Sequence, residues 1–184
     1  TGYVANSNDG TLLCFTGANS TDTSANVNTL NPRGVVTFNG AGTFSIATTY
    51  TGTSGNQTRG ATSLNNTTWY IGDQGGLYSN GTSSASPTGN FRSVKSFGGT
   101  AYVFTASASN PPVSTISAAV GGTLSALPGL PNGATSRTDF YLISSGANGA
   151  AFDVLYVLDA TSATAGTIYK YSLVSGAWTA NGTY

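Results

Sequence analysis

The sequence predicts an all-β fold, a β-propeller-like array of about four antiparallel, four-stranded meanders. Three observations lead to this prediction. No window of about 11 residues keeps the i, i+3, i+4, i+7 apolar pattern of an amphipathic helix. Short β-branched and aromatic runs are instead separated by Gly, Asn, Asp, Pro and Ser turns, which indicates about a dozen strands. One kind of run also recurs four times along the chain.

The recurring run forms the second strand of each expected meander. Its four copies are GTLLCFTG (10–17), TTWYIGD (67–73), GTAYVFTA (99–106) and DVLYVLDA (153–160). Residues 12–15 and 155–158 are apolar at every position, whereas a strand with one wet face alternates apolar and polar residues. We therefore expect these strands to be covered on both faces, as the middle strands of stacked blades are.

The other strands are expected around these copies. A first strand precedes each copy, at 2–7, 58–64, 91–97 and 137–144, and the first three of these pairs are joined by a tight Gly- or Asn-containing turn. Further strands follow at 33–39, 43–50, 76–79, 112–117, 167–173 and 177–184. The copies are roughly 30 to 60 residues apart, so the loops between them differ in length.

Two other folds remain open at this stage. A two-sheet β-sandwich would show inward and outward alternation on most strands. A parallel β-helix would need a strict short period, which the chain lacks. For any of these folds, the 184 residues are expected to form a single domain spanning 1–184.

Several of these stretches resemble a known group of proteins. TRGATSLNNTTWYIGD (58–73), TLSALPGLPNG (123–133), DVLYVLDA (153–160), TIYKYSLVSGAWTANGTY (167–184) and the opening hairpin at 8–24 resemble secreted or cell-surface β-propeller proteins of bacteria and green algae, most of them uncharacterised. The resemblance implies a propeller fold and an extracellular setting, and it implies no activity. Ala160 replaces the second Asp of the group's Asp-Asp pair, which puts any metal site there in doubt.

Composition limits what the chain can do. Only 7% of residues are charged, against about 25% in ordinary soluble proteins, and Glu, His and Met are absent. The net charge of zero provides no electrostatic attraction to nucleic acid or anionic lipid, and no apolar run reaches the ~18 residues that span a membrane. The lone Cys14 lies between Leu13 and Phe15, so we expect a small buried hydrophobic residue. No cofactor or metal is expected.

These features predict a non-catalytic, extracellular or cell-surface module that is structural, adhesive or self-assembling. Low net charge favours self-association over mutual repulsion. About four blades would leave unpaired edges and faces, which another copy of the chain, in an oligomer or filament, or a missing segment would cover.

Glycans are a second expected feature. Six Asn-x-Ser/Thr acceptor triplets begin at Asn19, Asn56, Asn65, Asn66, Asn80 and Asn181. Asn19, Asn56 and Asn80 lie in expected turns and are the best candidates for N-glycosylation. Asn65 and Asn66 overlap in a tight turn before an expected buried strand, so Asn80 should be modified more readily than either.

The alternative function is a carbohydrate-binding, lectin-like module. Aromatic side chains at a surface can stack on sugar rings. We expect Trp178, Tyr78 and Tyr184 to be available for this, together with Tyr3 and Tyr50. Trp69, Tyr70, Tyr102 and Tyr156 are expected in the core because they lie in the recurring runs.

A secreted hydrolase is the third hypothesis. A glycosidase needs two carboxyl groups that face each other, and Asp73, Asp139, Asp153 and Asp159 are the candidates. A structural role in turns is favoured over a catalytic role. Asp73 lies in Gly-Asp-Gln-Gly-Gly, a turn sequence in which Asn is as suitable as Asp, so we expect Asp73→Asn to be tolerated.

The arginines suggest a structural role. Arg59, Arg92 and Arg137 each begin the first strand of an expected blade, and Arg33 begins another strand. We expect their guanidinium groups to meet carbonyls or an Asp of a neighbouring blade.

Overall fold

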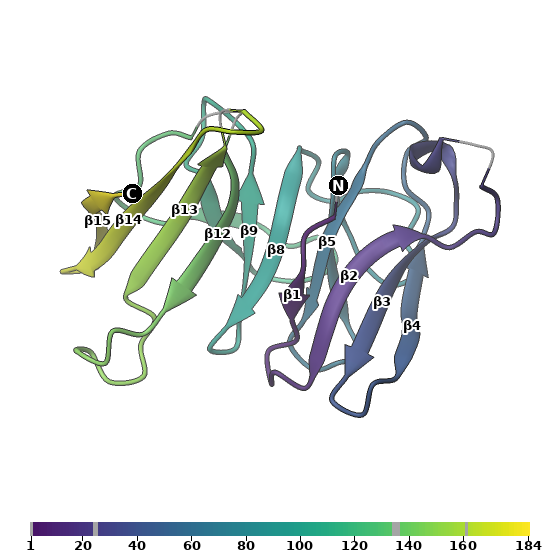
Figure 1. Ribbon diagram of the computed structural model, residues 1–184, viewed down its shortest axis with the longest axis horizontal. Coiled ribbons are helices and arrows are strands. Elements are labelled where there is room, and N and C mark those ends of the chain that lie inside the picture. The colour runs from purple at the N-terminus through teal and green to yellow at the C-terminus, as the bar shows by residue number, and fades with distance from the viewer. Residues whose placement is uncertain (1, 24–25, 134–136, 161) are drawn as a thin grey trace.

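The computed structural model describes residues 2–23, 26–133, 137–160 and 162–184, and the regular secondary structure of this part of the chain is β apart from one 3-10 turn. Its strands form four antiparallel sheets, which we name A to D in chain order (Figure 1). In every sheet the spatial order of the strands is their order in the sequence. Four sheets, rather than the two of a sandwich, confirm the prediction of successive antiparallel meanders.

The strand bounds agree closely with the expected ranges. Sheet A contains β1 (Ala5–Asn6), β2 (Leu12–Ala18), β3 (Arg33–Asn39) and β4 (Phe44–Tyr50). Sheet B contains β5 (Thr58–Ser63), β6 (Trp69–Asp73) and β7 (Gly76–Tyr78). Sheet C contains β8 (Phe91–Phe97), β9 (Thr100–Thr105), β10 (Val113–Ile116) and β11 (Leu124–Ala126). Sheet D contains β12 (Arg137–Ile143), β13 (Val154–Ala160), β14 (Gly166–Val174) and β15 (Ala177–Thr183).

Two details of the prediction were wrong. Sheet B has three strands, and the Asn-Gly-Thr at 80–82 does not lead into a fourth. Residues 79–90 are rich in Ser, Gly, Asn and Pro, which are poor strand formers, and they contribute a single bridge between Gly76 and Thr88. The short strand β11 and the 3-10 turn at Val27–Thr29 were not expected.

Tight turns lie where the sequence placed them. Gly98 and Gly99 join β8 to β9, and both have positive φ, 56° and 80°. Two residues with positive φ give the turn whose twist matches the flanking strands, and glycine adopts this conformation without steric cost. The local sequence therefore sets the register of this hairpin.

Neighbouring sheets pack face to face and form three apolar cores. The core between A and B includes Cys14, Val35, Trp69 and Ile71. The core between B and C includes Tyr70, Leu77, Val94 and Val103, and the core between C and D includes Phe104, Phe140, Leu155, Val157 and Trp178. In β6, Trp69 and Ile71 face sheet A whereas Tyr70 faces sheet C, because successive residues of a strand point to opposite faces.

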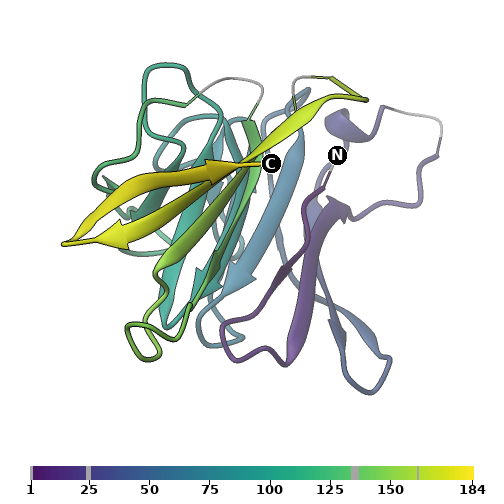
Figure 2. The same cartoon turned by 60° about the vertical axis from the view of Figure 1, so that its left-hand side comes forward.

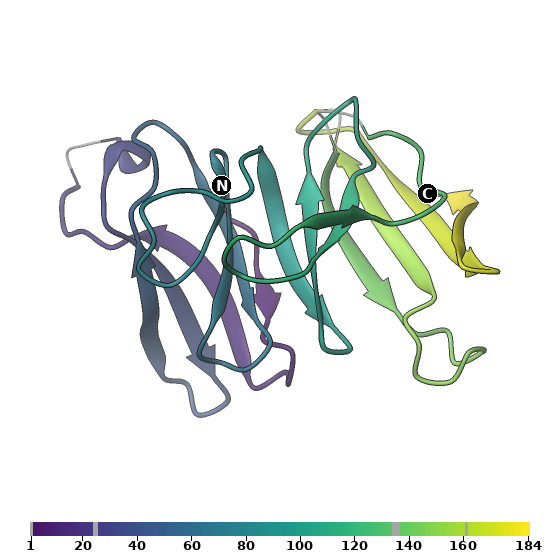
Figure 3. The same cartoon turned by 180° about the vertical axis from the view of Figure 1, so that it is seen from behind.

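The first strands of the meanders lie close to one another. Strand β5 contacts β2 and β8, β1 contacts β5 and β8, and β12 contacts β8. The last strands spread outward: β4 and β15 lie at opposite ends of the molecule in Figure 1. Figure 2 brings sheet D forward, and in the rear view of Figure 3 the short strand β11 lies in front.

Sheets A and D have a neighbour on one side only, and this corrects one expectation. The recurring strand is covered on both faces in sheet B, where every residue of β6 is buried. In sheets A and D, however, Leu13 of β2 and Leu158 of β13 are exposed. Burial on both faces therefore depends on position within the row of sheets and not on the strand alone.

The exposed side of sheet A, which we call the A outer face, is apolar. Leu13 pairs with Phe38 and Phe38 with Phe44, so these three side chains lie on one side of the sheet. Phe15 and Ile46 are on the same side, each opposite Val36. Phe44 is 64% exposed and Ile46 54%.

The exposed side of sheet D, which we call the D outer face, consists of Tyr141, Ile143, Tyr156, Leu158 and Ile168. Tyr141 pairs with Tyr156 and Leu158 with Ile168. Tyr141 is 51% exposed. Lys170 also lies here, opposite Tyr156, and its aliphatic stem can rest on apolar surface.

A buried ion pair joins sheets A and B. Arg33 Nη1 lies 2.6 Å from Asp73 Oδ2, and both side chains are almost fully buried. The Tyr50 hydroxyl also donates to Asp73 at 2.8 Å, while Arg33 Nη2 donates to the carbonyls of Asn28 and Thr53. Burial and then the Asp73 charge raise the pKa of Tyr50. Gly52 lies against this guanidinium, where a Cβ would overlap it.

This geometry supports the prediction that Arg33 has a structural role between sheets. It corrects the prediction that Asp73 is only a turn residue. Asp73 does accept the turn hydrogen bond from Gly75 N, but it is also the counter-ion of a buried arginine. Arg59 is likewise buried, and burial followed by the charge of Arg92 lowers its pKa. The side chain of Arg137 lies outside the described residues.

We expect Asp73→Asn to destabilise the fold by about 3–5 kcal/mol, because it leaves the Arg33 charge buried without a counter-ion. Urea unfolding measures the loss. Asp22→Asn, a change at an exposed loop carboxylate, is the matched control and should stay within about 0.5 kcal/mol of wild type. An Asp73→Asn variant as stable as this control would contradict the role given to the ion pair.

Candidate functional site

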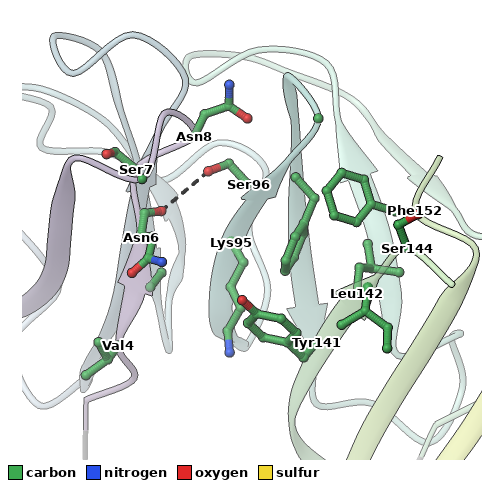
Figure 4. A pocket seen from close by; sticks show the side chains of 15 residues that line it. Val4, Asn6, Ser7, Asn8, Lys95, Ser96, Tyr141, Leu142, Ser144 and Phe152 are labelled. Atoms are coloured by element: carbon green, nitrogen blue, oxygen red, sulfur yellow. Dashed lines mark hydrogen bonds between the residues drawn. The ribbon is translucent and has the colours of Figure 1, made fainter. Parts of the chain in front are cut away.

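A groove lies where the first strands of sheets A, C and D approach one another. It has a volume of about 540 Å³ and is lined by β1 and the turn after it, by the end of β8, by β12, and by Phe152 (Figure 4). These segments are far apart in the sequence, so the groove exists only because the sheets stack in this order.

One wall of the groove carries a lysine whose charge is already matched. Lys95 Nζ lies 2.9 Å from Asp139 Oδ2, and it sits 5.5 Å from the ring centre of Tyr141 and 5.8 Å from that of Phe140. Both the carboxylate and the faces of the rings stabilise the ammonium group. Lys95 therefore joins sheets C and D and offers no free positive charge to a ligand.

The opposite wall comes from the start of the chain, where polar groups of Asn6, Ser7 and Asn8 lie beside Val4 and Ala5. The Asn6 carbonyl accepts hydrogen bonds from Thr62 Oγ1 at 2.7 Å and from Ser96 Oγ at 3.4 Å, the latter drawn in Figure 4. Asn8 Oδ1 accepts from Gly99 N at 2.8 Å. These bonds tie sheet A to sheets B and C at the mouth of the groove, and they leave the side chain of Asn6 exposed.

An aromatic cluster forms the apolar part of the lining. The ring of Phe97 lies 5.1 Å from that of Tyr141, 5.4 Å from Phe152 and 6.3 Å from Phe140. Exposed amide and hydroxyl groups of Asn6 and Ser144 stand near it. Apolar surface beside a few neutral hydrogen-bonding groups suits an uncharged polar ligand that has one apolar face.

Three of the five aromatics expected to be available for sugar stacking are in the core instead. Trp178 is 5% exposed in the core between C and D, and Tyr78 and Tyr50 are equally buried in the core between A and B. Their strands are covered by a neighbouring sheet, which the sequence did not reveal. Of the other two, Tyr3 is half-buried and Tyr184 has 73% of its surface exposed.

The aromatics that line the groove were not among the residues predicted to bind a ligand. Tyr141 lies between Phe140 and Leu142, which both point into the core, so alternation along β12 directs it outward. That alternation was the available signal. Tyr156 was expected in the core and is only half-buried, because the D outer face has no neighbour.

The four candidate carboxylates have separate structural surroundings. Asp73 pairs with Arg33 and Asp139 with Lys95. Asp153 accepts from Ser145 Oγ at 2.6 Å and Ser145 N at 2.7 Å, and these bonds lower its pKa. Asp159 is buried near the other end of β13, about 20 Å along the strand from Asp153, too far for the two to act on one bond.

In the described segments, no group of three or more His, Cys, Asp or Glu side chains could hold a metal ion. Cys14 is buried as predicted, and burial raises the pKa of its thiol to about 12. No helix within the described ranges is long and apolar enough to cross a membrane.

The acceptor asparagines differ in what their side chains already bind. Asn19 and Asn181 are exposed, and the amide nitrogen of Asn181 donates to Ser172 Oγ. Asn80 is exposed, but its amide bridges Trp69 N and the Thr67 carbonyl. Glycosylation replaces one N–H of the amide, and Asn66 donates both of its hydrogens, to Asp9 and Thr11. Modification of Asn66 would therefore break a contact between sheets A and B.

No protein-family model, no curated protein and no solved structure matches this chain. What the fold defines is a class: an all-β protein of four consecutive antiparallel sheets. Its function has to be argued from its own residues.

Asp9 is the centre of a hydrogen-bond network between two turns. Its carboxylate accepts from Ser7 Oγ at 2.6 Å, from Thr11 N and Thr11 Oγ1, and from Asn66 Nδ2 at 2.8 Å. These bonds, that of Ser7 first, lower the pKa of Asp9 from 3.8 to about 2. The ionised form is thus favoured in the folded chain.

This network makes part of the stability dependent on pH. A depressed carboxyl pKa contributes stability that is complete above the unfolded value of 3.8 and is lost as the pH falls toward about 2. We expect the difference in urea midpoint between wild type and Asp9→Asn to be largest above about pH 5 and to shrink between about pH 4 and pH 2. A difference that does not vary with pH would show that the charge of Asp9 is not what the network stabilises.

Proposed function

We propose that this chain is a non-catalytic, extracellular structural module of the β-propeller kind, in which the four sheets are blades. Its two outer faces are the sites of self-assembly, into an oligomer or a filament. A missing segment that completes the propeller is the other occupant these faces would accept.

The exposed apolar surface of the two outer faces carries this proposal. Each face holds five large apolar side chains, in a protein with only 7% charged residues. Contiguous apolar patches of this kind mark interaction sites, because soluble monomers rarely leave them open to water.

The interior of the molecule indicates what these faces are suited to bind. Strand β6 has sheets on both sides and is buried on both. Strands β2 and β13 have the same double-sided apolar pattern, yet a sheet covers only one side of each. Another sheet of the same kind would complete the burial that their sequences specify.

The remaining features agree with a structural and extracellular role. The candidate acids are held in ion pairs, hydrogen bonds or burial, which leaves little for acid–base chemistry. The acceptor triplets, the low charge and the resemblance to secreted propeller proteins support an extracellular setting.

We expect Phe44→Asp to weaken self-association by roughly 10- to 150-fold, since burial of a phenylalanine side chain contributes about 1.5–3 kcal/mol. Light scattering over a range of protein concentrations measures the association. Ser45→Asp is the matched control, an exposed neighbour in β4 whose side chain points to the other face. A wild-type chain that stays monomeric at every concentration would contradict self-assembly.

The groove favours a second candidate function, the binding of a neutral carbohydrate. The observation behind it is that the Tyr141 and Phe152 rings, which pack on the buried Phe97, lie in one groove with exposed amide and hydroxyl groups. Such a lining can stack on the apolar side of a sugar and bond to its hydroxyls.

If a carbohydrate binds there, Asn6→Ala should weaken its affinity by roughly 2- to 12-fold, the loss of about one neutral hydrogen bond. Glycan-array screening identifies the ligand, and titration calorimetry measures its affinity. Asn132→Ala, at an exposed asparagine that does not line the groove, should leave the affinity unchanged. Equal effects of the two variants would count against this site.

A further inference from the structure

We infer that the partner is a second copy of this chain and that two copies close head to tail into a two-fold ring of eight sheets. The D outer face of each copy packs on the A outer face of the other. This inference rests on the proposed function and adds the partner, the pair of faces and the stoichiometry.

The shape of the molecule supports closure by two copies. The first strands β1, β5, β8 and β12 lie close together in the middle of the molecule, and the last strands β4 and β15 lie at opposite ends (Figure 1). The two end faces therefore do not cover each other within one copy. Propellers close with about four to eight blades, and two copies of four sheets reach eight.

The internal interfaces define which faces belong together. We call the side of a sheet that packs on the next sheet in chain order its forward face, and the opposite side its backward face. Each interface joins the forward face of one sheet to the backward face of the next. For example, Tyr70 and Leu77 of sheet B contact Ala101 and Val103 of sheet C. In this sense the D outer face is a forward face and the A outer face is a backward face. Only a contact between D and A repeats the rule of the three internal interfaces, whereas A on A or D on D would break it.

The two faces are also complementary in shape and polarity. On the A outer face, Phe44 projects beside Phe38, with their ring centres 4.5 Å apart. The D outer face has an apolar hollow of about 200 Å³ between Tyr141, Tyr156, Leu158 and Ile168. The charged groups that line this hollow, Lys95 and Asp139, neutralise each other, and Lys170 of the same face does not line it. An aromatic projection can therefore enter this hollow without the burial of an unpaired charge.

Two-fold closure would also complete the groove. One of its walls belongs to sheet A and the other to sheets C and D, and it lies among the first strands β1, β8 and β12. In the closed ring the grooves of the two copies face each other across the axis. Each copy then supplies half of the lining of one central channel.

Size-exclusion chromatography with light scattering on three forms of the full chain tests the ring. The wild type should have twice the 18.5 kDa mass of one chain, and this mass should not grow with concentration. Phe44→Asp alters only the A outer face and Leu158→Asp only the D outer face. Each should raise the dimer dissociation constant at least about tenfold, because both interfaces of the two-fold dimer are damaged.

Mixing these variants tests the head-to-tail pairing of the two faces. Phe44→Asp and Leu158→Asp together retain one intact interface, so their equimolar mixture should form a 1:1 complex at concentrations where neither variant dimerises alone. Phe44→Asp mixed with Ile46→Asp, a second change on the A outer face, should form none. Circular dichroism and urea unfolding of each variant establish that it is folded.

Each other outcome overturns the ring in a distinct way. A mass that grows with concentration indicates a filament, and dissociation by Phe44→Asp but not by Leu158→Asp indicates pairing of two A outer faces. In both cases self-assembly stands and the ring fails. A wild type that is monomeric throughout overturns the ring and self-assembly together, and it points to sheets of another polypeptide as the cover.

Discussion

A sheet with two apolar faces needs a neighbour on each side to exclude water from both. In β6, Trp69 and Ile71 require sheet A, and Tyr70 requires sheet C. Each sheet that covers its neighbour has a second apolar face, which needs a further sheet to cover it. The first and last sheets of the row therefore each keep one apolar face exposed. The hydrophobic effect thus produces a row of stacked sheets and also leaves an unfinished surface at both ends.

Polar contacts fix how the stacked sheets are aligned. Apolar burial is not directional, whereas the Arg33–Asp73 and Lys95–Asp139 pairs have defined geometry and join A to B and C to D. The Arg33–Asp73 pair is buried, so the loss of either residue would leave the charge of the other buried without a counter-ion. In a chain with six acidic and six basic residues, two such contacts use a third of the charges to join sheets.

The groove and the outer faces follow from the same stacking. Asn6 and Ser96 are 90 residues apart, yet they share a hydrogen bond because β1 and β8 lie close together. Tyr141 belongs to both features, since it lines the groove and contributes to the D outer face. Occupancy of the D outer face would therefore affect the groove directly.

The amino-acid sequence predicted the strands, their order and most of their turns, because alternation of apolar residues and glycine or asparagine turns are local properties. It also predicted that Cys14 is buried and that Arg33 has a structural role. The burial of Trp178 and Tyr78, the contact of Asp73 with a buried arginine, and the exposure of Leu13 and Leu158 depend instead on which sheets become neighbours. The physical reason is that a strand's sequence specifies which side chains avoid water, whereas the position of its sheet in the row decides whether a neighbour is present to exclude that water.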